Sequence, residues 1–160
     1  MLLRQAFKFR LEPKPVARIL LAKFAGCCRL VWNKSLALQK ELLESGKKCV
    51  SFSQLCNQLT QWKRQEELVF LSDCHSQPLQ QVLKNLDRAL KEAFNKTNPK
   101  RFPRFKKKGQ RDSIRYPQGF KIDQLNSRVY LPKIGWVSYR KSRELVGQPK
   151  NITVSKRGNH

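Results

Sequence analysis

The apolar residues of this chain change their spacing near Asn95, and this change restricts the possible fold more than any other feature. Between residues 14 and 96 they recur every three or four positions, which is the period of amphipathic helices. After residue 95, Pro and Gly interrupt the chain at short intervals, and short apolar stretches alternate with polar ones. The first part is therefore predicted to be helical and the second part to be built from short strands.

Several helix boundaries can be predicted within the helical part. Pro15 suits the first turn of a helix, and Gly26 is expected to bend or break that helix. A second helical stretch is predicted to end at Gly46, and the next helix to begin with Ser53 as its N-cap. The clearest apolar stripe predicts a helix from about Ser76 to residue 95.

Strands are predicted at both ends of the chain. Residues 3–11 place Phe and Leu side chains on one side and Lys8 and Arg10 on the other, the pattern of a half-buried strand. Later strands are expected around the pairs Ile114 with Tyr116, Val129 with Leu131, Trp136 with Tyr139, and Ile152 with Val154. One strand, a helical insert and further strands together predict an α+β fold with a small β-barrel.

The residues from 100 to 111, called the basic segment below, carry seven Lys or Arg side chains and no acidic one. Residues 95–160 as a whole hold 18 basic and three acidic side chains, within a chain of net charge +23. Closely spaced cations match the phosphates of a polynucleotide and release its counterions. The segment therefore predicts nucleic-acid binding, and the alternative is a solvated linker. Phe102 and Phe105 could stack on bases or anchor the segment to the fold.

A second nucleic-acid signal is the pair of amphipathic helices predicted at 53–65 and 76–95. Such a pair could form a helix-turn-helix, although most amphipathic helices only pack a core. Ser76, Gln77 and Gln80 fall in the first turns of the second helix, where side chains that read base edges enter a groove.

Catalytic and metal-binding patterns are weak. His75 and His160 are isolated, and Asp112, Asp123 and Glu144 lie in separate turns or strand edges, so we expect these acids to form salt bridges. The five cysteines lack paired spacing and are expected to be reduced core residues, with a zinc site including His75 as the alternative. No apolar stretch approaches about 18 residues, so a cytoplasmic location without a membrane partner is predicted.

Several segments together resemble the N-terminal part of the insertion-sequence OrfB/TnpB family, the transposon-encoded relatives of type V CRISPR effectors. The resemblance covers nearly the whole chain in order and spacing. Its most specific parts are Phe102-Pro103-Arg104-Phe105-Lys106-Lys107-Lys108-Gly109 and Leu131-Pro132-Lys133-Ile134-Gly135-Trp136-Val137, accompanied by Ala6 to Leu11, Gly26 with Arg29 to Asn33, Leu79 to Ala89, and Asp112 to Tyr116.

The resemblance implies a wedge-like, oligonucleotide-binding β-barrel at 1–12 and 97–160, incomplete at its C-terminal end, with a helical recognition lobe inserted at 13–96. It implies a guide RNA scaffold and target-adjacent duplex DNA as partners, as in a transposase-associated, RNA-guided endonuclease. Residues that match the duplex-reading surface are Phe52, Cys56, Ser76, Gln77 and Gln80, with the loop Pro117 to Gly119. The residues predicted to contact nucleic acid are Lys8, Arg10, Arg29, Asn33, Lys100, Arg101, Arg104, Phe105, Lys106, Lys107, Lys108, Arg111, Arg115 and Lys133.

The family's longer members add a RuvC-like nuclease, which is expected to hold divalent metal, Mg²⁺, and a structural zinc element. The chain is expected to stop before that nuclease portion, in the turn of a hairpin after Ile152, and so to need no cofactor and perform no catalysis. Two other hypotheses stay open: a stand-alone helix-turn-helix DNA-binding regulator of the element, and an active nuclease that uses residues beyond 160.

Overall fold

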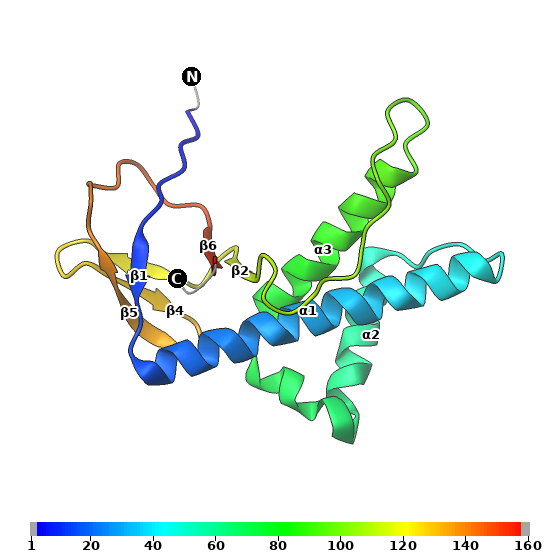
Figure 1. The fold of residues 1–160 in the computed structure, drawn as a ribbon, viewed down its shortest axis with the longest axis horizontal. Coiled ribbons are helices and arrows are strands. Elements are labelled where there is room, and N and C mark those ends of the chain that lie inside the picture. Colours follow the sequence, from blue (N-terminus) through cyan, green and yellow to red (C-terminus); the bar gives the residue numbers. More distant parts are fainter. Residues whose placement is uncertain (1–2, 158–160) are drawn as a thin grey trace.

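The long helix α1, Pro15–Glu44, joins the two ends of the molecule. In this computed structural model, which describes residues 3–157, the strands gather at one end of α1, and the other helices lie along its remaining length (Figure 1). Along the chain the elements follow in the order β1 (Arg10–Glu12), α1, α2 (Phe52–Arg64), the 3₁₀ helix η1 (Glu66–Asp73), α3 (Ser76–Ala93), β2 (Ser113–Tyr116), β3 (Lys121–Asp123), β4 (Arg128–Leu131), β5 (Gly135–Arg140) and β6 (Ile152–Ser155).

Helix α1 is continuous for 30 residues, so the expectation that Gly26 bends or breaks it was wrong. An interior Gly costs a helix about 1 kcal/mol relative to Ala. That cost is outweighed here because buried side chains flank Gly26 along the helix, among them Phe24 and Val31. Pro15 occupies the first turn, as predicted.

The start of α2 also differs from the prediction. Ser51, not Ser53, is the N-cap: its hydroxyl accepts a hydrogen bond from the Gln54 N–H, and the Gln54 side chain accepts one from the Ser51 N–H. This reciprocal pair is a capping box and fixes the first turn two residues earlier than expected. Helix α3 begins at Ser76, as predicted, with the imidazole of His75 accepting from the Gln77 N–H.

The strands form two antiparallel sheets. One sheet has the order β1-β5-β4-β3, and the other pairs β2 with β6. Strand β1 contributes only Arg10–Glu12, fewer residues than predicted, and β3 was not predicted at all. The expected alternation along β1 is confirmed, because Lys8 and Arg10 are exposed whereas Phe9 and Leu11 pack against the core.

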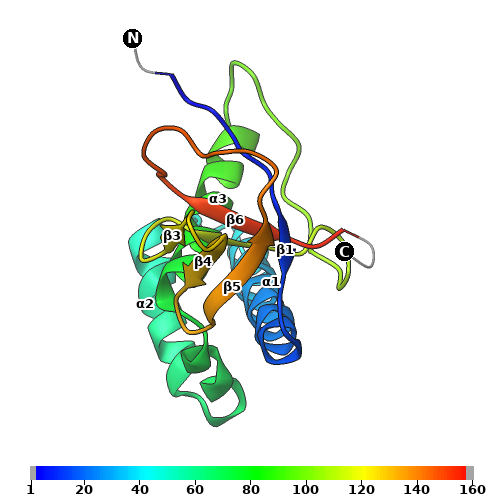
Figure 2. The same cartoon turned by 90° about the vertical axis from the view of Figure 1, so that its left-hand side faces the viewer.

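The α+β class and the helices inserted after the first strand are confirmed. Among residues 3–157, however, the two sheets do not close into a barrel. Figure 2 looks onto the four-stranded sheet, with the helices behind it. Strand β6 has β2 as its partner, with Ile114 opposite Val154. The turn expected to follow β6 includes residues 158–160, which lie outside the described residues.

A single hydrophobic core joins the helices to the sheets. It is built from α1, α2, α3 and the inner faces of the strands, including Leu36, Leu83, Tyr116 and Val137. None of the described helices is long and apolar enough to cross a membrane. The division into a barrel unit and a helical unit at residues 12 and 97 remains a prediction.

Candidate nucleic-acid interface

Helix α1 holds the backbone of the basic segment. The Asn33 side-chain amide donates to the Lys106 carbonyl oxygen over 3.0 Å, and the Lys106 N–H donates to the Asn33 side-chain oxygen over 2.8 Å. One helical position earlier, the Trp32 indole N–H donates to the Arg104 carbonyl oxygen over 2.8 Å. Three hydrogen bonds therefore fix residues 104–106 against α1.

The end of the basic segment is tied to the same helix by an ion pair. The Arg29 guanidinium lies 3.0 Å from the Asp112 carboxylate, and the Gly109 N–H donates to the other oxygen of that carboxylate over 3.3 Å. About a fifth of each side chain of the pair is exposed. Of the two α1 residues predicted to contact nucleic acid, Asn33 is thus bonded to the basic segment itself and Arg29 to Asp112, the residue that follows the segment.

The two aromatic rings of the basic segment have different environments. Phe102 is half-buried and packs edge-on against Phe94, with ring centroids 6.1 Å apart. Phe105 remains 48% exposed, and the Lys40 ammonium lies 4.9 Å from its ring centroid. Phe102 therefore anchors the segment, whereas the ring of Phe105 keeps a surface on which a base could stack.

The lysines of the basic segment are not equivalent either. Lys106 is exposed as a residue, but its ammonium lies 4.2 Å from the centroid of the Trp32 ring, and the partial desolvation of that ammonium lowers its pKa. Lys107 and Lys108 are exposed, and among the described residues neither has an acidic side chain within ion-pair distance. These two lysines present uncompensated charge to solvent.

A narrow cleft lies beside the basic segment, between α1, α3 and β2. The Arg115 Nε in its wall is buried and has no hydrogen-bond partner within residues 3–157. Such a donor is costly when buried and suits an anionic oxygen. On α3, the Gln81 side-chain amide donates to the Asn85 side-chain oxygen over 2.9 Å, and both residues line the cleft. Neither residue was predicted from the sequence, because polar residues four positions apart on a helix are common. The charged side chains of the cleft are Arg29, Lys106, Arg111, Asp112 and Arg115.

Other residues predicted to contact nucleic acid lie away from this cleft. Lys8 and Arg10 belong to the strand β1 end of the molecule and are exposed. Lys133, in the turn between β4 and β5, donates to the Ser72 carbonyl oxygen over 3.0 Å. Lys100 lies 3.8 Å from the Glu92 carboxylate, whereas Arg101 and Arg104 are exposed. The predicted set is thus divided between the basic segment and two other regions.

The duplex-reading candidates lie on α2 and α3. Phe52 and Cys56 are half-buried on α2, and burial raises the pKa of the Cys56 thiol. The ammonium of Lys84 on α3, a residue not predicted, lies 6.0 Å from the Phe52 ring centroid. Ser76 and Gln77 are half-buried in the first turn of α3, and Gln80 is exposed one turn later. The loop Pro117 to Gly119 approaches Pro132.

The acidic residues are engaged as predicted. Asp112, Asp123 and Glu144 pair with Arg29, Arg128 and Lys141 respectively. Within residues 3–157, no three His, Cys, Asp or Glu side chains form a group that could hold a metal ion. The resemblance places divalent metal and zinc in the nuclease portion of longer family members, and the expectation that this chain needs no cofactor stays a prediction.

Three of the cysteines are buried core residues. Cys27, Cys28 and Cys74 are buried and free, and a hydrogen bond with Cys74, followed by burial, raises the pKa of the Cys27 thiol. A raised pKa disfavours the thiolate that metal binding and redox chemistry need. The prediction of reduced thiols packed in the core is confirmed for these three.

Comparison with known proteins places these features in context. Residues 1–48 match the OrfB/IS605 family described as "Helix-turn-helix domain". The chain is 50% identical over 151 residues to the "Putative RNA-guided DNA endonuclease InsQ" of Escherichia coli (strain K12), covering 94% of this chain and 37% of that protein. It is 35% identical over 157 residues to the "Putative RNA-guided DNA endonuclease" of Streptomyces pristinaespiralis. That match covers 96% of this chain and 38% of the relative.

Two facts qualify these matches. The chain spans little more than a third of the length of both relatives. The described residues that match the helix-turn-helix family, 3–48, form β1 and one uninterrupted helix, whereas the helix pair predicted from the sequence, α2 and α3, lies outside the match.

Proposed function

Because this chain corresponds to the N-terminal part of an insertion-sequence OrfB/TnpB family protein, we propose that it is the nucleic-acid-binding region of such a protein. Its ligands are structured guide RNA and the duplex DNA beside a target. The basic segment tracks the sugar-phosphate chain, and base pairing by the guide supplies sequence choice.

The observation that carries this proposal is the fixed backbone of the basic segment. A flexible basic tail loses conformational entropy when it binds, whereas residues 104–106 are already hydrogen-bonded to Trp32 and Asn33. Preorganisation leaves Lys107 and Lys108 exposed at fixed positions. Counterion release at those positions then favours association with any closely spaced row of phosphates.

The cleft next to the basic segment supports the same assignment. Arg111 and Arg115 line it together with Arg29, and the buried Arg115 Nε has no partner among the described residues. A phosphate oxygen in the cleft would accept from that group and face several cations. Phosphate contacts of this kind position a polynucleotide without reading its sequence.

We assign no cutting step to the described residues. The nuclease activity in the relatives' names belongs to proteins of which this chain spans little more than a third. Cleavage of a phosphodiester by metal ions needs several converging carboxylates. Asp112, Asp123 and Glu144 are instead ion-paired, so residues 3–157 serve to hold nucleic acid.

The arrangement of the two proposed units follows from strand pairing. Arg10 in β1 lies opposite Arg140 in β5, so the first residues of the chain and the residues after 97 share one sheet. The helices between them form the lobe inserted at 13–96.

A second function is favoured by the helix-turn-helix description of the matched family. In that case the chain is a DNA-binding regulator. Helix α3 lies outside the matched residues, and its role as the reading helix rests on Gln80, which is exposed one turn above Ser76. Phe52, Cys56 and Gln77 would flank the groove. This function needs a specific duplex and no RNA.

Competition separates the two functions. Purified chain, freed of bound polynucleotide, is mixed with labelled structured RNA derived from the end of its insertion sequence, and duplex DNA from the same element is added as competitor. The RNA-binding proposal predicts that excess duplex displaces little RNA at equal phosphate concentration. Preferential binding of one duplex sequence over RNA would support the regulator, and binding of neither polymer would refute both.

A further inference from the structure

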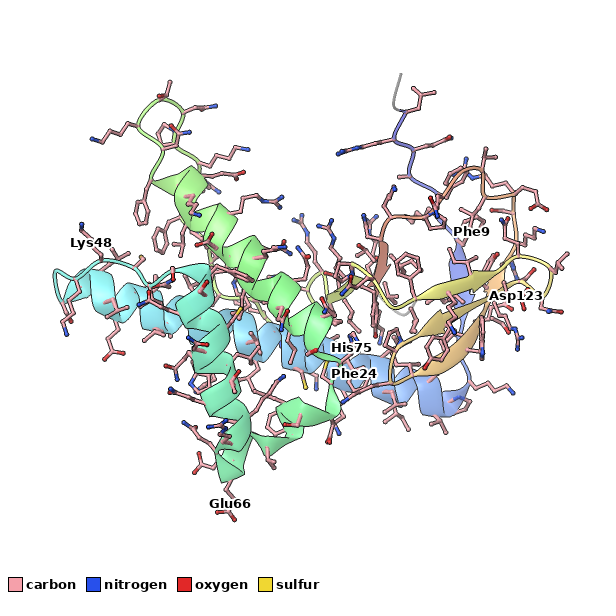
Figure 3. The ribbon with its side chains drawn as sticks, turned by 180° about the vertical axis from the view of Figure 1, so that it is seen from behind. Phe9, Phe24, Lys48, Glu66, His75 and Asp123 are labelled. Carbon is pink, nitrogen blue, oxygen red and sulfur yellow. The ribbon has the colours of Figure 1, made fainter. Side chains whose placement is uncertain are left out.

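The outer face of the four-stranded sheet carries aromatic and cationic side chains. Along β4 and β5, Val129 and Val137 are buried on the inner face, whereas Tyr130 is half-buried and Trp136 is exposed on the other. Figure 3 labels Asp123 of β3 and Phe9, the residue before β1, at the end of the molecule opposite Lys48. Of the residues on this face, only Arg10 was predicted to contact nucleic acid, and the two aromatic side chains were not.

The two aromatic rings lie next to each other. Tyr130 and Trp136 are direct cross-strand neighbours, and their rings meet edge to face with centroids 5.6 Å apart. The Arg128 guanidinium lies 4.3 Å from the centroid of the Trp136 ring, and the Lys121 ammonium 5.8 Å from that of Tyr130. Two π surfaces and two cations therefore form a continuous platform, which we call the Trp136 platform.

Exposure of the indole distinguishes Trp136 from the other tryptophans. Trp136 is 44% exposed, whereas Trp32 and Trp62 are 8% and 7% exposed. Water contact with a large aromatic surface is unfavourable, so an exposed indole held by neighbouring side chains indicates a contact surface more often than a packing role.

Charge on the same face favours a polyanion as the occupant. Arg10 and Arg140 are paired across β1 and β5 and extend the row of cations that begins at Lys121 and Arg128. Asp123 lies 2.9 Å from Arg128, and Glu12 lies 3.6 Å from Arg140. Cations therefore outnumber carboxylates, and the two acids orient the guanidinium groups rather than repel a phosphate chain.

We propose that the Trp136 platform is a separate binding site for single-stranded nucleic acid, in which unpaired bases stack on Trp136 and Tyr130 while Arg10, Lys121 and Arg140 contact the phosphates. Stacking on aromatic rings beside a basic track tolerates any base sequence. Paired bases in a duplex cannot reach the rings. This inference rests on the proposed function, because it assigns an unpaired part of the same polynucleotide to a second surface.

Trp136→Ala tests the platform with three ligands: a single-stranded RNA oligonucleotide, a single-stranded DNA oligonucleotide and a duplex. We expect the affinity for single strands to fall about 5- to 150-fold, the range for loss of one stacked base. Affinity for the duplex should stay within about twofold. The RNA and DNA arms decide which polymer the platform prefers. Trp136→Phe should restore most of the single-strand affinity, and Leu125→Ala, which alters a 96% exposed side chain, is the control.

Tryptophan fluorescence gives a second measurement that does not depend on a folded Ala variant. Single-stranded RNA should quench the emission of the unmodified chain, and Trp136→Phe should remove that quenching while RNA still binds. The platform is refuted if Trp136→Ala leaves single-strand binding unchanged, if it weakens duplex binding equally, or if quenching persists in Trp136→Phe. Failure of the proposed function looks different, since the unmodified chain would then bind no polynucleotide.

Discussion

Asn33→Ala should release the basic segment from α1 without unfolding the chain. The substitution removes two hydrogen bonds to Lys106, of 3.0 and 2.8 Å. Each is worth about 0.5–1.5 kcal/mol net, so the attached state loses about 1–3 kcal/mol relative to the detached state. The Lys106 backbone is exposed enough to bond to water once it is released.

Amide hydrogen exchange measures this change at the residues concerned. A loss of about 1–3 kcal/mol increases local opening roughly 5- to 150-fold, so the Lys106 amide should exchange faster by that factor. The core amides of α1 should keep their protection, because Ala favours a helix over Asn by about 0.5 kcal/mol. Asn57→Ala, at an exposed position of α2, is the matched control and should leave Lys106 unaffected.

Two results would contradict this reasoning. Unchanged exchange at Lys106 in Asn33→Ala would show that the two hydrogen bonds do not hold the basic segment. Faster exchange throughout the core would show that Asn33 stabilises the whole fold instead. Affinity for RNA should fall together with the attached population, because binding then has to order the segment again.

Two further predictions concern stability. Burial, and then the charges of Lys133 and Lys63, lower the pKa of His75 below its ordinary value of 6.5. As pH falls, the unfolded chain therefore takes up a proton on His75 before the folded chain does. The free energy of unfolding should then decrease as pH falls through about 6.5. Chemical denaturation at several pH values should show this decrease reduced in His75→Asn, which keeps an N-cap acceptor; an identical decrease would exclude His75 as its source. In the same assay, Ser51→Ala should lower the free energy of unfolding by about 1 kcal/mol, because it removes the N-cap of α2. Ser53→Ala should lower it little. The reverse order would show that α2 starts elsewhere.

The fold was predictable where one residue pattern dominated a segment. The apolar stripe of α3 and the alternation along β4 and β5 specify their elements locally, and both were found. Gly26 shows where local reasoning fails, because the packing of α1 against α3 decides the continuity of that helix and depends on residues distant in sequence. The short strand β3 has little pattern of its own and forms by pairing with β4.

The candidate site was predictable in its charge and not in its geometry. Seven cations in the basic segment are visible in the sequence. The hydrogen bonds that fix the segment join Asn33 to Lys106, which are 73 positions apart, and no local signal links those two residues. The Trp136 platform was missed for the same reason, since Tyr130 and Trp136 become neighbours only through the register of β4 and β5.

The salt dependence of RNA binding tests the role of the basic segment most directly. Lys107→Ala/Lys108→Ala removes two exposed cations from the segment, and Lys47→Ala/Lys48→Ala removes two exposed cations beyond the end of α1. The plot of log affinity against log salt should become shallower by about 1.4 for the first variant and stay unchanged for the second. Equal slopes for both variants and the unmodified chain would contradict the assignment of the basic segment as the phosphate-binding element.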